Sequence, residues 1–124
     1  MIEGTLWDAD ITPSEVDYIN AHGTGTVQND ELEAALLEKL FPHGPYVNST
    51  KSLLGHTIGA CGAIEAAVAV LGIQTGELHP TINLENPVRE LNFVRRRTSA
   101  SIVNALTHNF GFGGHNVGLV VGKD

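Results

Sequence analysis

A run of small and apolar residues between positions 57 and 75 constrains this chain more than any other feature. Glu65 is the single charged residue in the run, and an unpaired carboxylate in such a helix would be costly. Small side chains let a second backbone approach closely, so we predict a helix from Thr57 to about Thr75 that lies deep inside the molecule and is covered on more than one side. Its small residues are Ala60, Gly62, Ala63, Ala66, Ala67 and Ala69.

The chain shows no sign of export or of membrane insertion. The stretch from Ile58 to Ile73 is too short and too rich in glycine to be predicted as a membrane span. Met1 to Trp7 lacks the basic and apolar regions of a signal peptide. A single cysteine, Cys61, excludes a disulfide within the chain and fits a reducing compartment. We expect a soluble, cytoplasmic protein without a membrane partner.

Composition and charge limit the partners. The chain has 124 residues, 42% of them hydrophobic and 17% charged, which fits one globular domain. The net charge is −7 and Arg95 to Arg97 form the only basic cluster, so nucleic acid is not expected to bind. These arginines either form a solvated turn or dock an acidic carrier protein.

Hydrophobic spacing and turn residues predict an alternation of helices and strands. We expect a helix fragment over 1–8, a buried strand over 16–21, a helix capped by Asp30 and ending near Phe41, a strand over 46–50, a loop over 51–56, the helix over 57–75, an irregular segment over 76–94, and a hairpin with strands over 101–107 and 117–121. This order predicts an α/β domain of helices layered on a sheet. A sheet this small leaves the central helix in need of further cover.

Two histidines occur at transitions between predicted strands and helices, each beside a glycine. His22 follows the first strand and His56 precedes the small-residue helix. Such positions meet at one end of a sheet, where α/β folds place their sites, although a lone histidine is more often structural. Neither histidine has a zinc-ligand spacing, so no metal site is predicted. The segments "HGTGT" and "GFGGHNVG" match neither common nucleotide-binding pattern.

Lys51 and Glu65 lie on either side of His56 in the sequence. An ion pair between them would relieve the cost of a carboxylate in an apolar helix, and its role could be structural or functional. Cys61 has no activating neighbour in the sequence and is expected to be a small buried side chain rather than a nucleophile.

Three motifs in order resemble the C-terminal half of a β-ketoacyl-acyl-carrier-protein synthase of the condensing-enzyme type. They are "HGTGTVQND", "STKSLLGHTIGACGAIEA" and "NFGFGGHN". The resemblance implies a thiolase-like fold, with helices layered on a mixed sheet. Residues 1–124 would be the ketosynthase C-terminal domain without its first strand, completed by an N-terminal half or a partner chain. It further implies decarboxylative Claisen condensation of malonyl-carrier protein with an acyl-enzyme, in fatty-acid or polyketide synthesis.

The same resemblance assigns roles to residues that match the motifs. His22 and His56 would polarise the malonyl thioester carbonyl and stabilise the enolate. Lys51 would orient His56, and Glu65 would pair with Lys51 or anchor the loop. The assigned substrate-binding residues are Thr24 and Thr26, which would bind the pantetheine arm, Phe112, a gate whose backbone N–H contributes to the oxyanion hole, and its neighbour Gly113.

Asn20 with Glu65 resembles a structural monovalent-cation position, and no other cofactor is expected. Thr107-His108-Asn109 departs from the family pattern, in which an asparagine and a small residue precede "FGFGG".

The family nucleophile is a cysteine of the N-terminal half, and Cys61 does not replace it. We therefore expect a partner that supplies this cysteine, an acyl carrier protein, an oligomer, and no condensation by the chain alone. The alternative is a non-catalytic subunit of the chain-length-factor type that shapes a partner's acyl tunnel. A thiolase-like acyltransferase and a stand-alone metal hydrolase fit less well.

Overall fold

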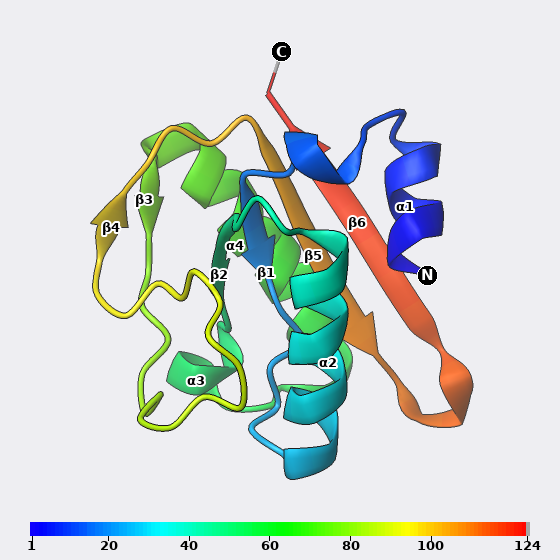
Figure 1. The fold of residues 1–124 in the computed structure, drawn as a ribbon, viewed down its shortest axis with the longest axis vertical. Coiled ribbons are helices and arrows are strands. Elements are labelled where there is room, and N and C mark those ends of the chain that lie inside the picture. The colour runs from blue at the N-terminus through cyan, green and yellow to red at the C-terminus, as the bar shows by residue number, and fades with distance from the viewer. Residues whose placement is uncertain (124) are drawn as a thin grey trace.

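The computed structural model describes residues 1–123 and contains a four-stranded mixed sheet with helices on both faces (Figure 1). The strand order is β2-β1-β5-β6. β1 (Tyr18–Asn20) is parallel to both β2 (Tyr46–Asn48) and β5 (Asn104–Phe110), whereas β6 (Asn116–Gly122) runs antiparallel to β5. The predicted hairpin and the predicted layering of helices on a mixed sheet are confirmed.

Each face of the sheet has its own apolar core. α1 (Ile2–Asp8) and α2 (Val27–Leu40) lie on one face and α4 (Cys61–Thr75) on the other (Figure 1). The first core consists of Ile2, Leu6, Val16, Ile19, Ala21, Leu37, Phe41, Val47 and Leu106, and the second of Tyr18, Ala69, Ile73, Leu78, Val94, Ile102 and Ala105.

The polar residues of strand β5 lie on both faces of the sheet. Ala105 belongs to the core beside α4 and Leu106 to the opposite core. Because side chains alternate along a strand, Thr107 and Asn109 face α4, and His108 faces α2. The carboxyl ends of β1, β2 and β5 meet at one edge of the sheet, at the bottom of Figure 1.

Several element boundaries differ from the predictions. α2 begins at Val27 after Thr26, so Asp30 lies inside the helix rather than at its cap. The predicted loop over 51–56 contains a short helix, α3 (Lys51–Leu54). β3 (Glu77–Leu78), in the segment expected to be irregular, pairs antiparallel with β4 (Thr98–Ser99). β5 continues to Phe110, into the predicted turn, because β6 pairs with it along its whole length.

α4 differs from the prediction in length and in burial. A 3-10 turn, Ile58–Ala60, leads directly into it, giving 18 residues of mean hydropathy 1.6 that are long and apolar enough to span a bilayer. The prediction that this stretch is too short was wrong, although core helices also reach this length and hydropathy. Only 28% of the stretch is buried within the chain. Ala69 and Ile73 pack on the sheet, but Leu71 is exposed, so the expected deep burial holds for one side.

Candidate functional site

Glu33 of α2 positions the loop that carries His22. Its carboxylate accepts the backbone N–H groups of His22 and Gly23, both at 2.8 Å. Gly23 has φ +46°, and a Cβ there would collide with the Ser49 hydroxyl. The glycine after His22 is therefore required both by its backbone conformation and by the close approach of β2's end.

Two side chains also donate to Glu33. His108 Nε2 lies 2.6 Å from Oε1, and Asn29 Nδ2 lies 2.9 Å from Oε2. Burial opposes ionisation of this carboxyl, but the hydrogen bonds from His108, Gly23 and Asn29 outweigh it and hold the pKa of Glu33 below its ordinary value. Glu33 is thus a buried carboxylate with four donors around it.

Lys51 and Glu65 form the predicted ion pair. Lys51 Nζ lies 2.5 Å from Glu65 Oε1, and the two side chains are 5% and 2% exposed. Asn109 joins both partners: its Oδ1 accepts from Lys51 Nζ at 3.1 Å, and its Nδ2 donates to Glu65 Oε2 at 2.6 Å. A charged pair buried this deeply depends on such additional hydrogen bonds.

His22 contacts this network through its ring. His22 Nδ1 lies 2.9 Å from Asn109 Oδ1. Burial lowers the pKa of His22 and the Lys51 ammonium acts in the same direction, while the hydrogen bond to Asn109 opposes them. His22 is therefore neutral at pH 7. Its ring packs edge-on against Phe110 and against His56, whose centroid is 5.9 Å away.

His56 is exposed, and neighbouring groups contact its Nδ1. The backbone N–H of Ile58 donates to His56 Nδ1 at 3.1 Å, and Cys61 Sγ lies 3.4 Å from the same nitrogen. Ile58 has φ +52°, a strained conformation for a β-branched residue. Within residues 1–123, Lys51 forms no hydrogen bond with His56. Cys61 is buried as predicted, but it does have a histidine neighbour, which the sequence spacing did not reveal.

The residues assigned to substrate binding lie at the same edge of the sheet. Thr24 Oγ1 and Thr26 Oγ1 are 3.0 Å apart on an open loop. Phe112 is fully exposed in the turn between β5 and β6, and Gly113 follows it with φ +77°.

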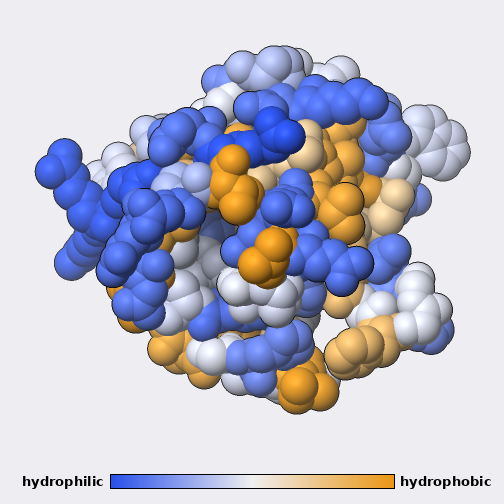
Figure 2. Space-filling model, turned by 60° about the horizontal axis from the view of Figure 1, so that its bottom comes forward, coloured by the Kyte–Doolittle hydropathy of each residue, from blue (hydrophilic) through white to orange (hydrophobic). Residues whose placement is uncertain are grey.

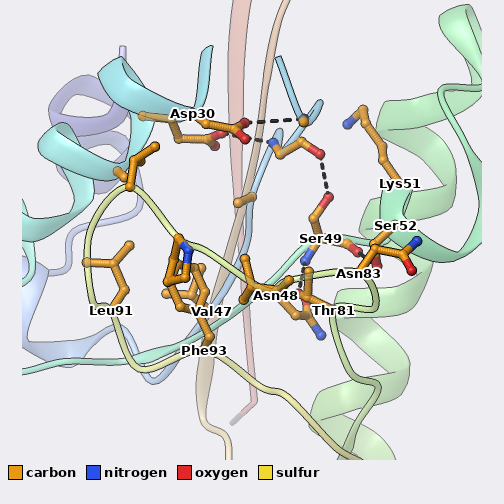
Figure 3. A pocket seen from close by; sticks show the side chains of 18 of the residues that line it. Asp30, Val47, Asn48, Ser49, Lys51, Ser52, Thr81, Asn83, Leu91 and Phe93 are labelled. Carbon is orange, nitrogen blue, oxygen red and sulfur yellow. Dashed lines mark hydrogen bonds between the residues drawn. The ribbon is translucent and has the colours of Figure 1, made fainter. Parts of the chain in front are cut away.

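A cavity of about 650 Å³ lies between α2, the end of β2 and the segment 81–93 (Figure 3). Thr24 and Lys51 line it, whereas His22 and His56 do not. The close-up shows Ser49 in the wall of this cavity. Its backbone N–H donates to Thr81 Oγ1, and its hydroxyl donates to the backbone carbonyl of Gly23. The cavity therefore adjoins the histidine pair without containing it.

Two unpartnered oxygens mark the suggested cation position. Asn20 Nδ2 donates to Thr50 Oγ1 at 2.7 Å, but Asn20 Oδ1 and Thr107 Oγ1 have no partner in the described chain. The two residues are paired across β1 and β5 and both face α4. Their oxygens suit a hard cation, whereas both Glu65 oxygens are already bonded. Residues 1–123 contain no group of three His, Cys, Asp or Glu that could hold a metal ion.

The three sequence motifs thus meet at one edge of the sheet, and comparison with known proteins shows the family to which the chain belongs. The family described as "Beta-ketoacyl synthase, C-terminal domain" matches residues 1–85. The chain belongs to the β-ketoacyl synthase family. Its thiolase-like fold agrees with a solved structure, "The ishigamide ketosynthase/chain length factor", at a TM-score of 0.93 and 35% identity over 99% of this chain and 32% of that one.

Curated relatives extend the match beyond residues 1–85 to nearly the whole chain. The 3-oxoacyl-[acyl-carrier-protein] synthase 2 of Coxiella burnetii is 44% identical over 98% of this chain and 31% of its own length. The polyketide biosynthesis malonyl-ACP decarboxylase PksF of Bacillus subtilis is 36% identical over 98% of this chain and 30% of its own length. The chain therefore spans about a third of the length of these relatives.

Glu33, His108 and Asn109 are the site residues that sequence reasoning missed as functional candidates. Glu33 had a detectable signal: it precedes Leu37 and Phe41 at intervals of four, which places it on the buried stripe of α2. Asn109 had none, because its role depends on the continuation of β5 beyond the predicted strand end.

Glu33→Gln is expected to lower the free energy of unfolding at pH 7 by about 2–4 kcal/mol, because the amide nitrogen would face two donors. The pKa of Glu33 is lower in the folded state, so its stabilisation is complete above the ordinary carboxyl pKa and is lost as the pH falls through the folded value. Urea unfolding at pH 7 and pH 4 should show a smaller pH dependence in the variant. Glu31→Gln, an exposed position on the same helix, is the matched control.

Proposed function

We propose that this β-ketoacyl synthase domain supplies the decarboxylation site for malonyl-acyl carrier protein in fatty-acid or polyketide synthesis. The observation that carries the proposal is the pair of histidines that follow β1 and α3, with ring centroids 5.9 Å apart. No residue in 1–123 forms a hydrogen bond with Nε2 of the largely buried His22 or of the exposed His56, so both nitrogens are left free to bond to a substrate.

The chemistry requires charge stabilisation at the thioester oxygen. The bond between the malonyl α-carbon and the carboxylate breaks, its electron pair moves into the thioester carbonyl, and carbon dioxide leaves. A histidine N–H beside the resulting enolate oxygen stabilises charge that develops only during the reaction. The enolate then attacks the acyl thioester of a cysteine outside this chain, and the cysteine thiolate leaves.

The relatives support both halves of this reaction. One carries the name malonyl-ACP decarboxylase and another the name 3-oxoacyl-ACP synthase. In the proposed site, Thr24 and Thr26 contact the pantetheine arm, and Phe112 with Gly113 borders the reaction centre. Asn20 and Thr107 offer oxygens to a structural monovalent cation beside the site.

Exposed apolar side chains support a partner that completes the domain. Ile58 is 74% exposed, Leu71 55% and Phe112 fully exposed. Figure 2, which brings the lower edge of Figure 1 forward, shows apolar side chains at several places among hydrophilic ones on this face. We propose that a ketosynthase N-terminal half carrying the nucleophilic cysteine covers these side chains and α4, within an oligomer.

The second candidate is a non-catalytic subunit of the chain-length-factor type. The observation in its favour is the similarity to a ketosynthase/chain-length-factor structure. Two histidines with open Nε2 atoms weigh against it, because a subunit that only shapes an acyl tunnel needs neither.

Combining the chain with a cysteine-bearing ketosynthase N-terminal half is expected to yield a stable complex that forms β-ketoacyl product from malonyl- and acyl-carrier protein. Neither component should form product alone, because condensation needs the acyl-cysteine and the histidines in one site. Product is measured by mass spectrometry of the carrier protein. A stable complex that releases no carbon dioxide and forms no product would contradict the proposal.

A further inference from the structure

We propose that Asn109 is a positioning residue that fixes the proton of neutral His22 on Nδ1, so that His22 and His56 offer opposite groups to the substrate. The hydrogen bond that one ring nitrogen of a histidine makes determines which of the two nitrogens carries the proton.

The ion pair determines the orientation of the Asn109 amide. Lys51 Nζ can only donate, and it lies 3.1 Å from Asn109 Oδ1. The Glu65 carboxylate can only accept, and it lies 2.6 Å from Asn109 Nδ2. Rotating the amide by 180° would place two donors against each other at Lys51 and two acceptors against each other at Glu65. The charges on both sides therefore exclude the rotated form.

This orientation leaves one choice at His22. Asn109 Oδ1 is an acceptor, so His22 Nδ1 at 2.9 Å must donate. Neutral His22 then carries its proton on Nδ1 and a lone pair on Nε2. The lowered pKa of His22 keeps the ring neutral at pH 7, where this tautomer matters.

His56 has the other tautomer. The backbone N–H of Ile58 donates to His56 Nδ1, so neutral His56 carries its proton on Nε2. His56 thus offers the donor that an enolate oxygen requires, whereas His22 offers an acceptor for an O–H or N–H of the substrate or of a bound water. In this proposed arrangement the two neutral imidazoles would not both donate to the same carbonyl.

The catalytic consequence rests on the proposed function, but the tautomer itself does not. It can be read from multiple-bond 15N–1H NMR spectra of the protein labelled with ring-15N histidine at pH 8, with the His22 signal assigned by its loss in His22→Gln. We expect a protonated Nδ1 at His22 and a protonated Nε2 at His56. Two histidines serve as internal references: His43 Nε2 donates to Val16 O, and His79 Nδ1 donates to Pro80 O.

Asn109→Ser is expected to shift neutral His22 toward the tautomer that carries its proton on Nε2. The serine side chain is shorter than that of asparagine, and its hydroxyl can donate as well as accept. The rate of malonyl-carrier-protein decarboxylation should then fall by about tenfold or more. The acid limb of its pH profile should move to lower pH, because a bond that raises the pKa of His22 is lost. Asn104→Ser, on the same strand but at the opposite end, is the control and should leave the His22 spectrum unchanged.

The results separate the two proposals. Nε2–H at His22 in the unchanged protein overturns the assignment of Asn109, whatever the activity. An unchanged tautomer and pH profile in a folded Asn109→Ser variant also overturn it. Nδ1–H at His22 in a protein without decarboxylase activity would support the role of Asn109 and contradict the proposed function instead.

Discussion

His56→Ala is expected to lower the rate of malonyl-carrier-protein decarboxylation by about 10²–10³-fold, since removing one preformed donor to a developing oxyanion has this effect in other enzymes. In the proposed arrangement, His56 carries the only Nε2–H of the histidine pair. Its side chain is exposed in the chain, so the loss of stability should be small. Release of 14C-labelled carbon dioxide from malonyl-carrier protein measures the rate directly.

His43→Ala is the matched control for this experiment. His43 is also exposed, but its ring bonds to Val16 O beyond the opposite, amino end of β1. Its replacement should leave decarboxylation unchanged. If His56→Ala retains full decarboxylation and alters only the length of the product made with a partner, the chain-length-factor interpretation is supported and the catalytic one is wrong. The same change at His22 tests the acceptor side of the pair.

The sequence predicted the arrangement of this domain better than its boundaries. Hydrophobic spacing is sufficient to locate α2, α4 and the β5–β6 hairpin, because each has a clear apolar face or a turn signal. The short helix α3 and the strand pair β3–β4 have no such signal, since tertiary contacts rather than local propensity stabilise elements of two to four residues.

The candidate site was predictable in part, for a related reason. His22, Lys51, His56 and Glu65 lie in motifs that resemble a known family. The cost of an unpaired carboxylate in an apolar helix suggested the ion pair. Asn109 contributes through Lys51, which is 58 positions away in the sequence. Such a contact exists only when β5 lies beside β1 with α4 behind it. The donor and acceptor pattern around His22 therefore required the register of the sheet.

Glu65→Leu is expected to lower the free energy of unfolding by about 3–5 kcal/mol, because it leaves the buried Lys51 ammonium without a counter-charge. The loss should far exceed that of Arg89→Ala at the exposed Arg89–Glu38 pair, where about 0–1 kcal/mol is expected. That pair has an N–O distance of 2.9 Å but side chains 44% and 53% exposed, so burial is the main difference. Urea unfolding of the three proteins measures both effects. Equal losses at the two sites would contradict the importance of burial.

The double variant Lys51→Met/Glu65→Leu separates a structural ion pair from a functional one. With both charges gone, an apolar pair fills the space and most of the stability should return, since buried ion pairs are often no more stabilising than hydrophobic replacements. Decarboxylation should not return, because nothing then holds the Asn109 amide in the orientation that fixes the His22 proton. If activity recovers together with stability, the Lys51–Glu65 pair serves only the packing of α4 against the sheet. If stability recovers alone, the pair acts on the chemistry through Asn109.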